Sequence, residues 1–517
     1  MVGGLSQIKE TQGKPHFQAL GNLQLHQAQL SGIDGNRPPS PGVGTGTDIT
    51  WPPINPTWTN ARDDRFGTPS WGTGSYNPSE VTWPSGASDP SWPTQPGWDI
   101  ATQPPWPTTS VYDPHISTLR PRCPGGACNG GAWIRNETLI GEWGSLVNVI
   151  ADAKLRTTEL IIKYGYPVET HFVTTKDGYV LCLHRMPRLG GYPILLVHGF
   201  MASTATWVQM GPNNGLAYIL FEQGYDVWML NTRGNLYSKA HKNPNINQKD
   251  YWKFSFHEIG IYDLPGAVDL ILSVTKQPKM QYIGHSQGST AFFVLCSEVP
   301  GYAEKFDLMQ ALSPTVYMQN SESPVLRFLS VFSGSYQVLV NLLGGFEIAK
   351  SNTLITQFRD HICSVTVANS EICAMFDFVT CGFGWSQLNS TLTPLVVGHA
   401  SQGASSMQIY HYAQQIKTSG FHRFDQGRMV NQIVYQNPQA PQYNLSRVTC
   451  KVALQHSQHD WMATRNDVEN LRLRLPRVID THMIEHRDFS HYDFTISKNV
   501  RKLVYRRIVK LTTQRIV

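Results

Sequence analysis

A serine between two glycines is the residue of this chain best suited to covalent chemistry. The pentapeptide Gly-His-Ser-Gln-Gly at 284–288 follows a short apolar run, 280–283, and precedes a helix-compatible stretch, 289–298. This setting is typical of a nucleophile elbow, in which the glycines let the backbone turn sharply and leave the hydroxyl of Ser286 at the tip. Because such a pentapeptide also arises by chance, the interpretation depends on partners elsewhere in the chain.

Those partners are a histidine and an acid. A serine hydroxyl is a poor nucleophile at neutral pH, so it needs an imidazole to accept its proton and a carboxylate to orient the imidazole. On folds that carry this elbow, the acid and then the histidine follow the serine, in loops after later strands. Asp460 follows an expected strand at 452–455, and His491 follows one at 482–484. The order and placement predict a triad of Ser286, Asp460 and His491.

Other acids and histidines lie in the same region. They are Asp467, Asp488, Asp493, His456, His459 and His486. Asp467 falls where a helix at 466–473 should already have begun, so it points poorly for the task. Asp493 comes two residues after His491. A residue so close in sequence cannot easily orient the ring and at the same time belong to the earlier loop from which the acid is expected. Asp460 and His491 are therefore the preferred pair.

Metal-assisted chemistry has little support in the sequence. His482 and His486 are four residues apart, but they lie around a strand and no third zinc ligand is evident. His257 and Glu258 lack the second histidine of the His-Glu-x-x-His motif. The sequence predicts no metal site and no cofactor.

An oxyanion hole needs two further donors. The tetrahedral intermediate of acyl transfer places negative charge on an oxygen that backbone N–H groups can stabilise. One donor is expected from the residue after the nucleophile and one from the loop after the first buried strand. Here these are the N–H groups of Gln287 and of Phe200, which lies in the loop at 198–203.

The elements that must position these residues alternate between strands and helices. Strands are expected at 172–175, 179–184, 193–197, 225–230, 280–283, 306–312, 452–455 and 482–484, and helices at 216–223, 262–275, 289–298 and 466–473. The continuous apolar run at 193–197 marks a strand buried on both faces of a parallel sheet. The alternation predicts an α/β fold with a mostly parallel central sheet.

Composition divides the chain of 517 residues at about residue 135. Residues 1–135 are rich in Pro, Gly, Ser and Thr and carry seven of the 14 tryptophans between Trp51 and Trp106, a composition that predicts disorder. Residues 136–517 are expected to form the folded domain. The rhythm of strands and helices breaks at about 315–446, which indicates either an inserted cap or an extra structural subdomain, and periodicity alone does not decide between the two. For an enzyme acting on apolar substrates, a cap would cover an apolar cleft and move to admit substrate.

Charge and targeting features limit the partners. The net charge of +5 has its visible basic excess at 501–515, which we interpret as a solvated helix face, and no nucleic-acid partner is predicted. No run of 18 apolar residues predicts a transmembrane span. Residues 1–6 lack the features of a signal peptide, whereas eight cysteines and N-glycosylation sequons at Asn136, Asn389 and Asn444 favour a secreted protein. This mismatch indicates a missing or mis-assigned N-terminus.

Several ordered segments resemble the acid lipase family of α/β hydrolases, which includes gastric and lysosomal acid lipases and insect relatives. They are YGYP at 164–167, TKDGY at 175–179, HGFMAS at 198–203, GYDVW at 224–228, NTRGN at 231–235, FSFHE at 254–258, YDLP at 262–265 and GHSQG at 284–288. The resemblance covers about residues 160–509 and excludes the Trp-rich segment.

The resemblance implies an α/β-hydrolase fold with a mobile cap. It also implies hydrolysis of triacylglycerols or sterol esters at a lipid–water interface through an acyl-enzyme, and a secreted or lysosomal location. Within the cap, Cys363 and Cys373 match the family's disulfide pair, and Cys381 matches a third cysteine outside that pair. Two alternatives stay open: a lipid-binding or structural homologue with weak catalysis, and an esterase for short soluble esters.

Overall fold

The computed structural model describes residues 134–348, 380–382, 384, 386–387, 389–400 and 402–514. The predicted disorder of residues 1–135 falls almost entirely outside the described residues, and so does the predicted disulfide between Cys363 and Cys373. Both stay predictions.

A nine-stranded sheet forms the centre of the described part of the chain. The strands of the structure are β1 (Glu169–Thr174), β2 (Tyr179–Met186), β3 (Pro193–Val197), β4 (Asp226–Leu230), β5 (Ala240–His241), β6 (Met280–His285), β7 (Phe306–Leu312), β8 (Glu347–Ile348), β9 (Ala404–Ser405), β10 (Lys451–Ser457) and β11 (Val478–Ile484). The order in the main sheet is β1-β2-β4-β3-β6-β7-β10-β11, with β5 beside β2. Pairing is antiparallel at β1-β2, β2-β4 and β2-β5 and parallel from β4 to β11. The predicted mostly parallel α/β sheet is confirmed.

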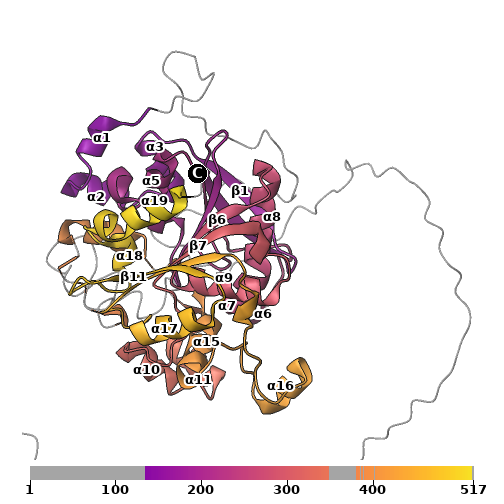
Figure 1. Ribbon diagram of the computed structural model, residues 1–517. Helices are drawn as coiled ribbons and strands as arrows, with labels where there is room; N and C mark the ends of the chain where they lie inside the picture. The colour runs from indigo at the N-terminus through magenta and orange to yellow at the C-terminus, as the bar shows by residue number, and fades with distance from the viewer. Residues whose placement is uncertain are drawn as a thin grey trace, which may run out of the picture. The chain divides into compact units, whose positions relative to one another are not determined.

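Helices connect the strands and cover both faces of the sheet (Figure 1). Those described are α1 (Glu137–Gly141), α2 (Leu146–Asp152), α3 (Thr157–Lys163), α4 (Gly211–Asn214), α5 (Leu216–Glu222), α6 (Gln248–Tyr251), α7 (Phe256–Glu258), α8 (Leu264–Thr275), α9 (Gln287–Glu298), α10 (Pro324–Ser330), α11 (Tyr336–Leu343), α14 (Thr393–Gly398), α15 (Ser406–Lys417), α16 (Arg428–Tyr435), α17 (Arg465–Arg474), α18 (Asp493–Ile496) and α19 (Arg506–Thr513). The helix expected at 262–275 begins at Leu264, because a π-helical turn, Ile259–Asp263, precedes it.

Alternate residues of β3 pack into two different hydrophobic cores. Leu195 and Val197 belong to the core that includes α8 and α9, whereas Ile194 and Leu196 belong to the core that includes α5 and α19. All five residues of β3 are buried. Full burial of one such aliphatic side chain contributes roughly 1.5–3 kcal/mol, so a strand that is apolar on both faces is stable only between two layers of helices.

A long insertion separates β7 from β10 and coincides with the cap expected at 315–446. It contains α10, α11, α14, α15 and α16 and the small antiparallel pair β8-β9. Leu329, Leu339 and Tyr410, from α10, α11 and α15, form a separate hydrophobic cluster. Figure 1 shows these three helices together at one end of the domain, next to α17.

The turn from β6 into α9 is too tightly packed for a side chain at either of its glycines. A Cβ atom at Gly288 would lie 2.3 Å from the carbonyl oxygen of Val197, and one at Gly284 would lie 2.7 Å from the carbonyl carbon of Gly288. Neither glycine has a positive φ; the left-handed residue of the turn is Ser286, at φ 53°. The expectation that the glycines supply the conformational freedom of the turn is therefore wrong. They supply room for α9 to approach β3.

We expect Gly288→Ala to destabilise the fold by about 1–3 kcal/mol or more, because the new methyl group meets a backbone carbonyl that cannot move independently of β3. Denaturant unfolding measures this change. Gly334→Ala is the matched control, since a Cβ there meets nothing within 4 Å. Equal unfolding free energies for the two variants would contradict the packing argument.

Candidate active site

Ser286 lies at the carboxyl end of β6, where the chain turns into α9. Its N–H donates to the carbonyl of Leu312 at the end of β7, at 2.9 Å, and its own carbonyl accepts from the N–H of Ser289, also at 2.9 Å. These bonds hold the backbone at φ 53° and ψ −120°. In this conformation Oγ lies 2.8 Å from Nε2 of His491.

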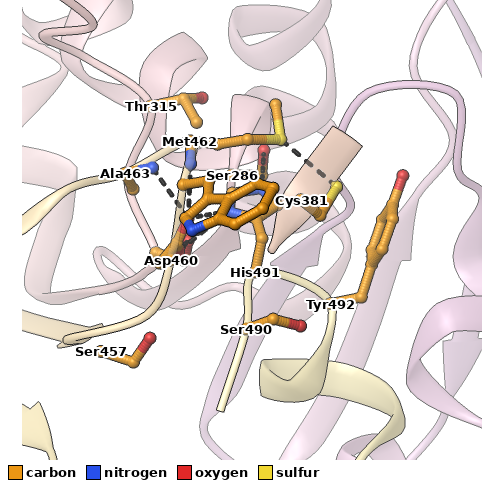
Figure 2. Close-up of polar contacts among 12 residues, drawn as sticks. Ser286, Thr315, Cys381, Ser457, Asp460, Met462, Ala463, Ser490, His491 and Tyr492 are labelled. Atoms are coloured by element: carbon orange, nitrogen blue, oxygen red, sulfur yellow. Dashed lines mark hydrogen bonds and ion pairs between the residues drawn. The ribbon is translucent and has the colours of Figure 1, made fainter. Parts of the chain in front are cut away.

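His491 lies between Ser286 and Asp460 (Figure 2). Its Nδ1 lies 3.0 Å from both carboxylate oxygens of Asp460. Because a carboxylate only accepts, Nδ1 carries the hydrogen and Nε2 is left to accept from the hydroxyl of Ser286. The three side chains come from loops after β6, β10 and β11, and all are buried. The structure thus brings together the three residues of the predicted triad.

The carboxylate of Asp460 is surrounded by donors. The backbone N–H groups of Met462 and Ala463 donate to Oδ1, at 2.9 and 2.8 Å, and the hydroxyl of Ser313 donates to Oδ2. Burial alone would raise the pKa of Asp460, but the interaction with His491 and the hydrogen bonds from Ser313 and Ala463 hold that pKa below its ordinary value. The acid is therefore ionised and held in one orientation.

The loop that carries His491 is fixed on both sides. Nε2 of His285 donates to the carbonyl of His491 at 3.0 Å, and burial lowers the pKa of His285 to about 3, so its ring stays neutral. The hydroxyl of Ser457 donates to the carbonyl of Phe489 at 2.7 Å. These bonds position the imidazole without adding a charge beside it.

The loop after β3 lies against the nucleophile. A Cβ at Gly199 would lie 3.1 Å from Cβ of Ser286. Nδ1 of His198 donates to the carbonyl of Gly199 at 2.8 Å, and because carbonyl and N–H of a trans peptide point in opposite directions, the N–H of Phe200 points away from His198. Within the described residues, neither that N–H nor the N–H of Gln287 donates a hydrogen bond. Both groups are thus available to a ligand.

The alternative residues take other roles. Asp467 lies in the first turn of α17 and accepts from the N–H and the side-chain amide of Asn320, at 3.1 and 2.8 Å. Asp493 accepts from Ser490 rather than from His491. His486 contacts Gln387. In the part of the chain that the structure describes, no group of three or more potential metal ligands occurs.

Ser313 is a site residue that the sequence analysis did not single out. It directly follows β7, at the same sheet edge as the triad, and its Oγ lies 2.6 Å from Nδ1 of His491. Its place directly after a predicted parallel strand was the one signal that could have found it.

Comparison with known proteins agrees with this architecture. Residues 192–493 match the family described as alpha/beta hydrolase fold, and residues 157–211 match the one described as partial alpha/beta-hydrolase lipase region. Lipase 1 of Drosophila melanogaster is 38% identical over 365 residues, which cover 70% of this chain and 81% of that protein. Lysosomal acid lipase/cholesteryl ester hydrolase of Homo sapiens is 30% identical over 72% of this chain and 94% of its own length. Gastric triacylglycerol lipase of Mus musculus is 31% identical over 72% and 95%.

These matches extend from the first strands through the cap to the loop of His491, and they cover most of each relative. They confirm the resemblance carried by the sequence motifs. The chain belongs to the acid lipase family of α/β hydrolases.

Proposed function

We propose that this protein is a serine lipase that hydrolyses ester bonds of neutral lipids through an acyl-enzyme on Ser286. The observation that carries the proposal is the position of His491, with Nε2 2.8 Å from Oγ of Ser286 and Nδ1 3.0 Å from both oxygens of Asp460. This arrangement provides a nucleophile, a general base and an orienting acid in one buried cluster.

The reaction follows from these contacts. Oγ of Ser286 attacks the ester carbonyl carbon while Nε2 of His491 takes the hydroxyl proton. The carbon–oxygen bond to the alcohol then breaks, and His491 gives that proton to the departing alcohol. Water attacks the acyl-enzyme by the same route, and the fatty acid leaves as Ser286 regains its proton. Asp460 stays ionised throughout and stabilises the imidazolium.

The developing oxyanion requires donors already aimed at it. The N–H groups of Phe200 and Gln287 suit this role. Gln287 directly follows Ser286, Phe200 directly follows Gly199, which lies against Ser286, and neither N–H donates to another described residue. Removal of one such donor in comparable sites costs about 3–4 kcal/mol of transition-state stabilisation.

The substrate class is supported by the relatives. One of them is named a cholesteryl ester hydrolase and another a triacylglycerol lipase. We therefore favour long-chain neutral lipid esters, presented at a lipid–water interface, over short soluble esters. The cap between β7 and β10 supports this choice, since it is hydrogen-bonded to Met201 in the loop after β3, to Gln287 and to Trp461, which lie next to the proposed catalytic residues.

A secreted or lysosomal location completes the proposal. Each sequon asparagine uses only its side-chain oxygen in a local cap: Oδ1 of Asn136 accepts from Leu139, that of Asn389 from Thr391 and that of Asn444 from Ser446. The amide nitrogens, to which a glycan would be attached, are not committed by these bonds. Among the described residues, every helix is too short or too polar to cross a bilayer.

Ser286→Ala should abolish ester hydrolysis, by a factor of about 10⁴ or more in kcat, while leaving the unfolding free energy nearly unchanged. Hydrolysis of an emulsified triacylglycerol and labelling by a fluorophosphonate probe measure the loss. Ser297→Ala is the matched control, because the hydroxyl of this buried serine in α9 has no hydrogen-bond partner in the described structure. Equal turnover by wild type and Ser286→Ala would exclude the proposed nucleophile, and a wild type that neither reacts nor labels would favour the lipid-binding alternative.

Substrate profiling separates the remaining alternatives. We expect kcat/KM to rise from acetyl to long-chain acyl esters and to be higher on emulsions than on soluble monomers. A profile that peaks at short soluble esters would identify an esterase instead. Comparing cholesteryl oleate with triolein then distinguishes the two neutral-lipid classes.

Asp493 gives the domain a predictable pH dependence. Its Oδ2 accepts from the N–H and the hydroxyl of Ser490, at 2.6 and 2.9 Å, and its side chain is buried. Burial raises the pKa of Asp493 to about 7. The hydrogen bonds from Ser490 oppose this rise, and the charge of Asp460 adds a smaller contribution to it. The folded pKa thus exceeds the value of about 4 in an unfolded chain. The stability that this group contributes is fully present below pH of about 4 and is lost as pH rises through about 7.

Asp493→Asn removes this titration and keeps an oxygen to accept from Ser490. We expect the variant to match wild type near pH 4 and to exceed its unfolding free energy by roughly 2–4 kcal/mol at pH 8. Thermal or urea unfolding from pH 4 to 8 tests this. Asp269→Asn, at an exposed position, should show no such divergence with pH. If the difference in unfolding free energy between Asp493→Asn and wild type were the same at every pH from 4 to 8, the titration of Asp493 could not be its cause.

A further inference from the structure

We infer that Ser313 is a positioning residue of the triad, whose hydroxyl holds the carboxylate of Asp460 and the ring of His491 in their productive orientation. The inference rests on the proposed ester hydrolysis. In the described structure no hydrogen bond joins Ser313 to Ser286. Oγ of Ser313 lies beside Nδ1 of His491, whereas Nε2 faces Ser286, so Ser313 acts through the acid and the base.

The contacts of Ser313 form a closed triangle. Its Oγ lies 2.6 Å from Nδ1 of His491 and donates to Oδ2 of Asp460, while Nδ1 lies 3.0 Å from that same carboxylate oxygen. A hydroxyl has one hydrogen and two lone pairs. Since the hydrogen goes to the carboxylate, a lone pair faces the N–H of His491. Ser313 therefore supports the tautomer that leaves Nε2 free to accept from Ser286.

The backbone holds Ser313 in place for this contact. Its φ is 49°, in the left-handed region that non-glycine residues rarely adopt. The N–H of Ser313 donates to the carbonyl of Gln455 in β10, at 2.8 Å, which ties it to the strand that leads to Asp460. A strained backbone kept by surrounding bonds is a feature that often accompanies functional sites.

Burial strengthens the hydrogen bond that the hydroxyl of Ser313 donates to the carboxylate of Asp460. Ser313, Asp460 and His491 have exposed fractions of 0%, 2% and 1%. Water therefore cannot readily replace a lost donor, and a hydrogen bond to a charged group in such a place is worth more than a surface one. In the described structure, Ser313 is the one hydroxyl that donates to Asp460; the other donors are the N–H groups of Met462 and Ala463 and the ring of His491.

The titratable surroundings make a pH profile a useful measurement. The groups that face Asp460 are His491, His285 beside the nucleophile, His456 in β10, Asp493 in α18 and, across Met462, the thiol of Cys381. Figure 2 shows Met462 between Asp460 and Cys381. The substitution Ser313→Ala changes none of these groups. A shift of the acidic limb of kcat/KM would therefore report on the Asp460–His491 pair itself.

We expect Ser313→Ala to lower kcat about 10- to 100-fold with little change in KM. The acidic limb of kcat/KM should also move to higher pH, because the carboxylate has lost a donor that favours its charged form. Ser313→Gly removes the same hydroxyl and relieves the left-handed backbone, so it should show the same kcat and pH shift even if Ser313→Ala folds poorly.

Ser238→Ala is the matched control, since Ser238 is equally buried and hydrogen-bonded but lies away from the triad, donating to the carbonyl of Asn231. It should leave kcat and the pH profile unchanged. The inference would be overturned if both Ser313 variants kept the wild-type kcat and an unshifted acidic limb of kcat/KM. It would also be overturned if kcat fell while the acidic limb stayed at the wild-type pH. Neither result affects the proposed function, which Ser286→Ala tests independently.

Discussion

The left-handed backbone of Ser286 is the constraint around which the site is built. A non-glycine residue in a sparsely populated region of this kind costs roughly 1–3 kcal/mol, so its surroundings must hold it there. The end of β7 does so through the carbonyl of Leu312, and α9 does so by lying against β3, which only a glycine at position 288 allows. In this conformation the hydroxyl of Ser286 lies 2.8 Å from Nε2 of His491.

Hydrogen bonds link the ends of successive strands along this edge of the sheet. The N–H of Ser286, after β6, donates to the end of β7; the N–H of Ser313, after β7, donates to Gln455 in β10; and the hydroxyl of Ser457, at the end of β10, donates to Phe489 in the loop after β11. These three hydrogen bonds thus link the carboxyl ends of four neighbouring parallel strands. Because Ser286, Asp460 and His491 follow different strands of this series, the distances between them depend on the sheet rather than on any one loop.

Much of this could be predicted from the sequence, for identifiable reasons. The run at 193–197 is apolar throughout, which only a doubly covered strand explains, and Asp460 and His491 follow strands in the order that the elbow requires. Ser313 could not be found this way, since a serine after a strand is common and its contacts come from residues 147 and 178 positions away. The role of Gly288 was misjudged for a similar reason: the atom that excludes a side chain there, the carbonyl oxygen of Val197, belongs to a distant segment.

The cap is hydrogen-bonded to three of the segments that build the site. The N–H of Gln402 donates to the carbonyl of Met201 in the oxyanion loop at 2.8 Å, and the side-chain amide of Gln408 in α15 donates to Oε1 of Gln287 at 3.0 Å. On the third side, the N–H of Glu322 donates to the carbonyl of Trp461, next to the acid, at 2.7 Å. A cap that moves to admit a lipid must either break these bonds or carry the attached groups with it. The position of the cap is therefore coupled to the loops that carry Phe200 and Gln287, the two proposed oxyanion donors.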